Sequence, residues 1–225
     1  MTDGLTLADL VLAAGVAFFL GSVPTAWLVA RSRGVNIFNV GTRQAGAANV
    51  YREVGRTAAI FVGVVDAAKG GVAILIAIWA GLEGSWLLLP AVAAILGHWN
   101  SPMTRFRGGD GVATAVGVLL IMSPTGLFVP VLLGASVTLV LSNFMEHPSP
   151  WGGFVGLTTI VLFSSLEFTG LSAITVIGVL AIAASIYLHS YMYHRRKVGA
   201  FTTVLMDDDL TDAPIPRTQK PQAPA

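Results

Sequence analysis

The stretch TAAIFVGVVDAAKGGVAILIAIWA, residues 57–80, carries only two charged side chains, Asp66 and Lys69. A helix needs about 20 mostly apolar residues to cross the roughly 30 Å hydrocarbon core of a bilayer. The stretch therefore predicts a membrane-spanning helix. Asp66 and Lys69 lie three residues apart, on one face of that helix. Because charge inside a bilayer is costly, we interpret the two side chains first as an internal ion pair and second as a substrate contact.

Six further apolar stretches predict further spans. They cover about residues 5–30, 85–99, 112–122, 125–144, 154–168 and 171–193. The spans on either side of Pro124 are separated there, because proline cannot continue the hydrogen bonds of a helix. Charged residues make up 11% of the chain and hydrophobic residues 54%, whereas an ordinary soluble domain has about 25% charged residues. This composition excludes a typical cytosolic enzyme and a disordered chain.

Basic residues collect on one side of these spans. Five arginines lie between the first two spans, two lie between the third and fourth, and further Lys and Arg follow the last. The opposite connections, near Asp3, Glu83, Ser123 and Glu167, contain neither Lys nor Arg. The positive-inside rule then places the N-terminus outside and the C-terminus in the cytoplasm, which needs an odd number of spans. The predicted fold class is an all-α integral membrane protein with about seven transmembrane helices.

The chain divides into a membrane domain and a tail. Residues 1–200 are expected to form one polytopic membrane domain. Residues 201–225, which contain the run DDDLTDAPIPRTQKPQAPA, are acidic and then rich in proline, so they predict a disordered cytoplasmic tail. Tryptophans near span ends are typical of interfacial anchors, and we interpret five of them in that way: Trp27, Trp79, Trp86, Trp99 and Trp151.

The first cytoplasmic connection, residues 39–56, reads NVGTRQAGAANVYREVGR. Gly41 and Gly46 allow backbone N–H groups to turn inward. Together with Arg43 and Arg52, those groups predict an anion-binding nest. The alternative is an interfacial helix that packs through its small residues.

The second cytoplasmic connection, residues 105–117, reads RFRGGDGVATAVG. A glycine-rich turn that opens a helix offers free N–H groups and a positive dipole to a phosphate, although membrane helices also use glycine for close packing. Asp110 fits the start of the helix as a cap, but its charge would repel an anion.

Two further features have ordinary explanations. The segment YHRRK, residues 193–197, is typical of a topology anchor after the last span, and a lone His98 near an interface usually packs or hydrogen-bonds. The chain contains no GxSxG element, no HExxH and no paired-histidine spacing, so no serine hydrolase and no zinc enzyme is predicted. We expect no metal site.

At these residues the chain resembles the bacterial acyl-phosphate:glycerol-3-phosphate acyltransferases, the PlsY family. The strong matches are GSVPTAWLVAR (21–31), NVGTRQAGAANVYREVG (39–55), VDAAKG (65–70) and LGHWNSPMTRFRGGDGVATAVGV (96–118). Weaker matches follow in FVGLTTI (154–160) and YHRRK (193–197). Together they cover about residues 20–197 in the family's order.

The resemblance implies transfer of a fatty acyl group from acyl phosphate to the 1-hydroxyl of glycerol 3-phosphate. The product would be lysophosphatidic acid for phospholipid synthesis, with no cofactor. It also implies seven spans in the bacterial inner membrane and an active site that faces the cytoplasm. Because acyl phosphate is already activated, positioning and charge neutralisation would carry most of the catalysis. We expect membrane lipid around the chain, no nucleic-acid partner and a monomer.

The resemblance also implies roles for single residues. His194 matches the histidine of the family's C-terminal HRExN pattern, and Thr42 keeps a hydroxyl in its first motif, so both are expected to be catalytic. Arg52 matches the arginine that follows the GxxNV element and is expected to hold a substrate phosphate. The other expected phosphate-binding residues are Arg43, Lys197, Gly108, Gly109 and Gly111, and the expected supporting residues are Asn49, His98 and Asp110.

The chain departs from the family's motifs at several polar positions. The family has Gly and Asn in GSGNxGATN, Lys in GGKG, Ser in VSLxS, and Glu and Asn in HRExN. In the same order, this chain has Arg43 and Gln44, Asp110, Gly156, and Arg196 and Val198, the last of which follows Lys197. Two interpretations stay open. Either Arg43 and Lys197 replace the lost lysine charge, or the chain is a catalytically inactive relative that binds anionic lipid or a partner membrane protein. A small transporter is less favoured, because no inverted repeat is evident.

Overall fold

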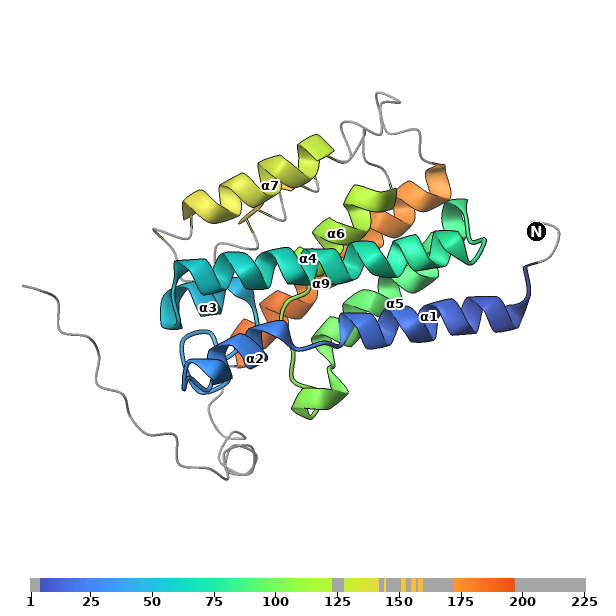
Figure 1. Ribbon diagram of the computed structural model, residues 1–225. Coiled ribbons are helices and arrows are strands. Elements are labelled where there is room, and N and C mark those ends of the chain that lie inside the picture. Colours follow the sequence, from blue (N-terminus) through green and yellow to red (C-terminus); the bar gives the residue numbers. More distant parts are fainter. Residues whose placement is uncertain are drawn as a thin grey trace, which may run out of the picture.

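The structure, a computed structural model, describes residues 5–122, 128–141, 144, 151–152, 155–156, 158–159 and 172–196. Within this part of the chain the regular elements are all helical and no strand is present, as predicted (Figure 1). The α-helices are α1 (Leu7–Gly21), α2 (Thr25–Ser32), α3 (Ala47–Glu53), α4 (Arg56–Trp79), α5 (Leu88–Trp99), α6 (Val112–Met122), α7 (Phe128–Leu141) and α9 (Ala173–Arg196). Two short 3-10 helices are η1 (Gly84–Leu87) and η2 (Pro102–Thr104).

Several helices coincide with the expected spans. Leu7–Ser32 and Arg56–Trp79 are long and apolar enough to cross a bilayer, and Val112–Met122 and Ala173–His189 are shorter apolar helices. The helix α6 has the bounds expected for the span over residues 112–122. Most of the expected span over residues 154–168, and the whole tail over residues 201–225, lie outside the described residues.

The expected span over residues 5–30 corresponds to Leu7–Ser32, but the helix is interrupted within it. The helix α1 ends at Gly21 and α2 begins at Thr25, because Pro24 lacks an N–H group and interrupts the helical hydrogen bonds. Backbone carbonyls released by such a break need donors from the protein, since a bilayer supplies none, and the Thr25 N–H donates to the Val23 carbonyl at 3.0 Å. The Ser101 hydroxyl donates to the Ser22 carbonyl at 2.5 Å, and the Lys69 ammonium donates to the Val23 carbonyl at 2.9 Å. Contacts from other parts of the bundle therefore stabilise the break between α1 and α2.

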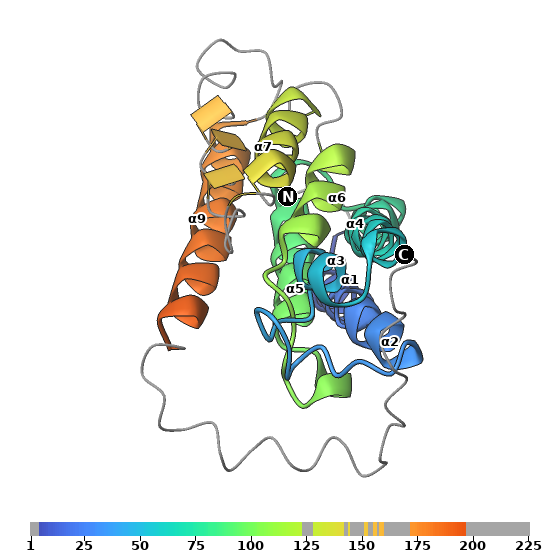
Figure 2. The same cartoon turned by 90° about the vertical axis from the view of Figure 1, so that its left-hand side faces the viewer.

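Helix pairs pack closely through small residues. The helix α1 packs on α5, and α4 packs on α6. A Cβ atom at Gly117 of α6 would clash with the carbonyl oxygen of Ala67 on α4, so only glycine allows this approach. Figure 2 shows α5 and α6 between α9 on one side and α4 on the other. The close packing fixes the ends of α4, α5 and α6 relative to one another.

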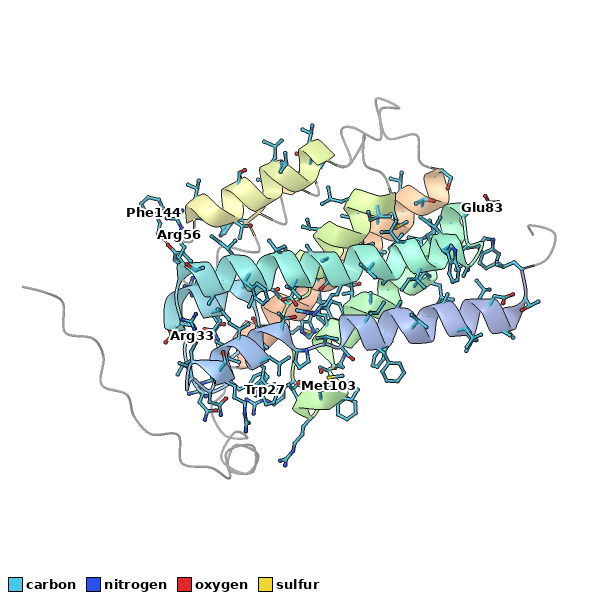
Figure 3. The ribbon with its side chains drawn as sticks, in the orientation of Figure 1. Trp27, Arg33, Arg56, Glu83, Met103 and Phe144 are labelled. Atoms are coloured by element: carbon cyan, nitrogen blue, oxygen red, sulfur yellow. The ribbon has the colours of Figure 1, made fainter. Side chains whose placement is uncertain are left out.

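The two ends of the bundle differ in charge. The helices α2 and α3 lie at one end, beside the start of α4, whereas η1 lies at the other end (Figure 1). Figure 3 shows Arg33 and Arg56 at the first end and Glu83 at the opposite end. We call the first end the basic end. The two loops that resemble the family's motifs are the first loop, residues 33–46 between α2 and α3, and the second loop, residues 100–111 between α5 and α6.

Candidate functional site

Asn49, in the first turn of α3, fixes the shape of the first loop. Its side-chain amide donates to the carbonyls of Ile37, Val40 and Gln44 at 3.1, 3.2 and 3.0 Å. Its side-chain oxygen accepts the backbone N–H of Thr42 at 3.0 Å. Asn49 is only 1% exposed, so these loop groups have no water to replace it. One buried side chain therefore holds most of the loop, including the expected catalytic residue Thr42.

The two glycine-rich loops contact each other directly. The Ala45 N–H of the first loop donates to the Gly108 carbonyl of the second at 3.1 Å, and the Gly109 N–H donates to the His98 carbonyl at 3.3 Å. A Cβ atom at Gly109 would lie 2.5 Å from the Ala45 oxygen and would clash with Nε2 of the His98 ring. The expected residues Gly108, Gly109 and His98 thus meet the first loop at one seam, which is defined by Ala45, Gly108, Gly109 and His98.

Replacing Gly108 with alanine should disrupt this seam. The added Cβ would clash with the His98 carbonyl oxygen and would lie 2.5 Å from the Trp99 carbonyl oxygen. Backbone atoms cannot rotate away, so we expect destabilisation by about 2 kcal/mol or more and loss of activity. Thermal unfolding and initial rates measure both. Gly15→Ala is the control, because a Cβ at this α1 position meets no atom within 4 Å; an equal loss in both variants would contradict the contact.

His98 is joined to the charged pair on α4. The Lys69 ammonium lies 2.8 Å from Asp66 Oδ1, which confirms the predicted internal ion pair. The same ammonium lies 2.9 Å from Nδ1 of His98. His98 and both charged residues are buried. The histidine at the end of α5 therefore packs and hydrogen-bonds, as its position predicted, but its partner is a charge from another span.

Trp99 has a different role from the predicted interfacial anchor. Its ring is half-buried and stacks on the ring of His189 from α9, with centroids 4.4 Å apart and planes 6° apart. Its indole N–H donates to the Asp110 carbonyl at 2.7 Å. Trp99 thus ties α5 to α9 and to the loop before α6. The interpretation as an anchor is corrected because partners within the protein hold both the face and the edge of the ring.

Asp110 lies where the second loop turns into α6. Its carboxylate accepts the Val112 N–H at 3.4 Å, a long contact that caps the helix start weakly. Burial raises the pKa of the Asp110 carboxyl, and the nearby Asp66 carboxylate adds to this increase, while backbone N–H groups oppose it. Gly111 follows with a φ of +84°. Asp110 therefore caps the start of α6, as the sequence analysis considered, and it lies beside the proposed anion site.

Five arginines belong to the two loops and to α3, and three of them bear on the candidate site. Arg52 is half-buried and lies three residues after Asn49 on α3, whereas Arg43 is exposed at the tip of the first loop. Arg43 has a φ of +58°, a left-handed conformation that glycine adopts more easily. The guanidinium of Arg107 lies 4.4 Å from the Phe38 ring centroid and donates to the Phe38 carbonyl at 3.4 Å. Arg107 therefore fastens the second loop to the first.

The structure connects some of the predicted site residues, and two others lie outside the residues whose side chains it describes. The seam and the Asn49 network connect Thr42, Asn49, His98, Gly108 and Gly109. The side chain of His194, in the last turn of α9, and the whole of Lys197 lie outside the described residues. Within the described residues, no group of three or more His, Cys, Asp and Glu could hold a metal ion.

Sequence reasoning missed two features of this site. The first is the Lys69–His98 contact, which joins residues 29 positions apart. The second is Gln44, which is buried and whose side-chain Nε2 has no hydrogen-bond partner among the described residues. A buried polar group without a partner calls for an explanation such as a ligand. The signal for Gln44 was its amide, at a motif position where the family also has an amide.

Comparisons with a family model, with related sequences and with solved structures all point to the same family. Residues 11–201 match the family model described as glycerol-3-phosphate acyltransferase. Glycerol-3-phosphate acyltransferase 1 of Deinococcus radiodurans is 41% identical over 154 residues, which cover 68% of this chain and 77% of that protein. A glycerol-3-phosphate acyltransferase of Thermus thermophilus is 42% identical over 138 residues, covering 61% and 69%. The crystal structure of PlsY, an integral membrane glycerol 3-phosphate acyltransferase in its glycerol 3-phosphate form, superposes with a TM-score of 0.69 at 26% identity, covering 84% and 91%.

Proposed function

The chain belongs to the glycerol-3-phosphate acyltransferase family, and on that premise we propose that it makes lysophosphatidic acid from acyl phosphate and glycerol 3-phosphate. A lysophosphatidic acid form of the PlsY structure also superposes on the chain, with a TM-score of 0.60. The observation that carries the proposal is the seam, where two glycine-rich loops hydrogen-bond to each other. Such a seam suits a phosphate site because it fixes the positions of both loops and of the arginines that they carry.

Each candidate residue has a role in this reaction. Arg52 holds one substrate phosphate, and Arg43 or Lys197 holds the second. The Thr42 hydroxyl donates a hydrogen bond to substrate, and His194 positions or polarises the acceptor hydroxyl. The buried amide of Gln44 adds a donor whose Nε2 has no partner among the described residues. These groups neutralise the charge of the substrate phosphates, and they fix the orientation of the acceptor hydroxyl relative to the acyl group.

Beyond neutralising charge and orienting the substrates, the protein has little to supply to the reaction. The 1-hydroxyl oxygen of glycerol 3-phosphate attacks the acyl carbonyl carbon, a new ester C–O bond forms, and the acyl C–O bond to phosphate breaks. Inorganic phosphate leaves, and the proton of the hydroxyl ends on it. Both reactants are anions, so the site must overcome their mutual repulsion, which is worth several kcal/mol at about 4 Å in a low-dielectric site. Cationic side chains and loop N–H groups at the basic end supply that compensation.

The proposal includes a topology. We place the basic end in the cytoplasm of a bacterium, with about seven transmembrane helices, the N-terminus outside and the C-terminus inside. The positions of Arg33, Arg56 and Glu83 support this orientation through the positive-inside rule (Figure 3). Residues 1–200 form the membrane domain, residues 201–225 form a cytoplasmic tail, and the chain acts as a monomer in the inner membrane.

Product formation by purified protein tests the proposal. In detergent or vesicles with acyl phosphate and radiolabelled glycerol 3-phosphate, we expect labelled lysophosphatidic acid, which thin-layer chromatography detects. Glycerol in place of glycerol 3-phosphate should give no product, because the phosphate is the group that the loops and arginines bind. Absence of product from the full substrate pair would contradict the proposed function.

The second candidate is a catalytically inactive relative that binds anionic lipid or a partner membrane protein. Asp110 and Gly156 favour it, since a carboxylate and a bare backbone stand where the family has Lys and Ser. Replacing Asp110 with lysine changes the local charge by two units, each worth roughly 4 kcal/mol at 4 Å and an effective dielectric constant of 20. Activity that appears only in Asp110→Lys would establish an inactive natural chain; we expect activity in the wild type.

A further inference from the structure

Lys69 lies on α4 inside the bundle and is 8% exposed. Its ammonium nitrogen pairs with Asp66 Oδ1 at 2.8 Å, donates to the Val23 carbonyl at 2.9 Å and lies 2.9 Å from His98 Nδ1. A lysine ammonium has three N–H donors and no acceptor. Protein groups therefore surround the ammonium: two of them lie at hydrogen-bond distance, and the Asp66 carboxylate pairs with its charge. The second interpretation of Lys69, a direct substrate contact, does not fit this geometry.

The contact with His98 determines where the imidazole carries its proton. Because the ammonium can only donate, Nδ1 of His98 must accept. The ring is then neutral, and its single proton is on Nε2. This assignment follows from the hydrogen-bond network around the ring, and it depends on the positive charge of Lys69.

The protonated nitrogen of His98 faces the seam between the loops. A Cβ atom at Gly109 would clash with Nε2 of His98 and would lie 2.5 Å from the Ala45 carbonyl oxygen. The Nε2 atom therefore lies against the α-carbon of Gly109, next to the first loop. Asn49 holds the other side of that loop. A change in the tautomer of the His98 ring would therefore alter the contact between the two glycine-rich loops.

Lys69 also connects the elements that lead into both loops. The Val23 carbonyl is in the break before α2, and α2 leads into the first loop. His98 is in the last turn of α5, and α5 leads into the second loop. An ion pair that only stabilised α4 would need no contact outside that helix. The ammonium instead joins α4 to the break before α2 and to the last turn of α5.

We propose that Lys69 is a positioning residue for acyl transfer: by donating to Nδ1 of His98 and to the Val23 carbonyl, it fixes the Nε2–H tautomer of His98 at the seam and holds the two glycine-rich loops in register. The inference rests on the proposed function for its catalytic consequence. Its structural part, the tautomer, stands on the geometry alone.

The tautomer is measured by ¹⁵N nuclear magnetic resonance of the histidine rings in the full-length protein. The chain has four histidines, and the signals that disappear in His98→Asn assign the ring. In the wild type we expect protonated Nε2 and unprotonated Nδ1. The variant Lys69→Met should lose this single pattern and show exchange between the two tautomers, because its side chain cannot donate.

Activity is compared in a variant designed to keep its stability. Lys69→Met alone leaves Asp66 unpaired, so it is made together with Asp66→Leu, since apolar replacement of a whole buried ion pair is often neutral or stabilising. We expect kcat to fall about 100-fold, as for a misplaced reacting group. The KM for glycerol 3-phosphate should change less than about threefold, because the phosphate-binding side chains remain. Ala68→Met, at the adjacent exposed position of α4, is the matched control.

The possible results separate the inference from the proposed function. A folded Asp66→Leu/Lys69→Met variant with wild-type kcat would overturn the inference and show an ion pair with a stabilising role only. A wild-type spectrum with protonated Nδ1 would overturn it as well, whatever the activity. A wild-type protein with the expected tautomer but no product from acyl phosphate and glycerol 3-phosphate would instead overturn the proposed function, and with it the catalytic half of the inference.

Discussion

Replacing Asn49 with aspartate should reduce acyl transfer by at least about 100-fold and lower the thermal stability of the protein. The two side chains have nearly the same shape, but an aspartate carboxylate has no N–H donor. The carbonyls of Ile37, Val40 and Gln44 would lose their partner and face a negative charge. Each buried polar group left without a partner costs about 1–3 kcal/mol. The first loop could not keep its conformation.

Asn100→Asp provides a matched control for this substitution. Asn100 is exposed, and among the described residues its side-chain amide donates to the Leu96 carbonyl alone, at 3.3 Å. The control should keep both its rate and its unfolding temperature within error of the wild type. Initial rates of lysophosphatidic acid formation and the intrinsic fluorescence of the five tryptophans during heating measure the two effects. Wild-type activity in Asn49→Asp would show that the loop does not form the site.

Replacing Arg52 with alanine should lower kcat/KM by about 100-fold, which corresponds to about 2.7 kcal/mol. Arg52 is half-buried on α3, and hydrogen bonds to charged groups are worth about 1.5–3 kcal/mol. Removing the guanidinium leaves a substrate phosphate without its cationic partner. Arg52→Lys should recover part of the loss, since lysine keeps the charge but not the two parallel donors. Steady-state kinetics with varied glycerol 3-phosphate measure kcat/KM for the wild type and for the two variants.

Arg56→Ala separates a specific contact from overall charge. Arg56 is the exposed first residue of α4 at the same end of the bundle (Figure 3). Its removal changes the net charge by the same amount as the removal of Arg52. We expect only a small effect, which added salt should screen. Equal losses in the two variants would mean that Arg52 acts by general electrostatic attraction and binds no phosphate.

The sequence alone predicted the helical class and several helix positions because hydropathy reports directly on membrane spans. The bounds of α6 and the Asp66–Lys69 pair follow from run length and from the period of the helix. The break at Pro24 was missed, since the apolar run continues through it and only the proline signals the interruption. Whether such a proline is tolerated depends on donors elsewhere in the chain, here Ser101 and Lys69.

The candidate site was predictable in its residues but not in its connections. Glycines and arginines in the two loops pointed to phosphate binding. The contacts that give the site its shape join Asn49 to the first loop, His98 to α4 and Trp99 to α9. No local pattern encodes these pairings, because each depends on how separate helices pack. For the same reason, sequence reasoning interpreted Trp99 as an anchor and missed its stacking on His189.

Equilibrium binding of glycerol 3-phosphate to the purified protein tests most directly whether the two loops form a phosphate site. Isothermal titration is carried out on the wild type, on Asn49→Asp and on Asn100→Asp, with glycerol as the ligand that lacks phosphate. We predict saturable binding to the wild type and to Asn100→Asp, none to Asn49→Asp, and none of glycerol to any of them. Undiminished binding by Asn49→Asp, or no binding by the folded wild type, would contradict the account.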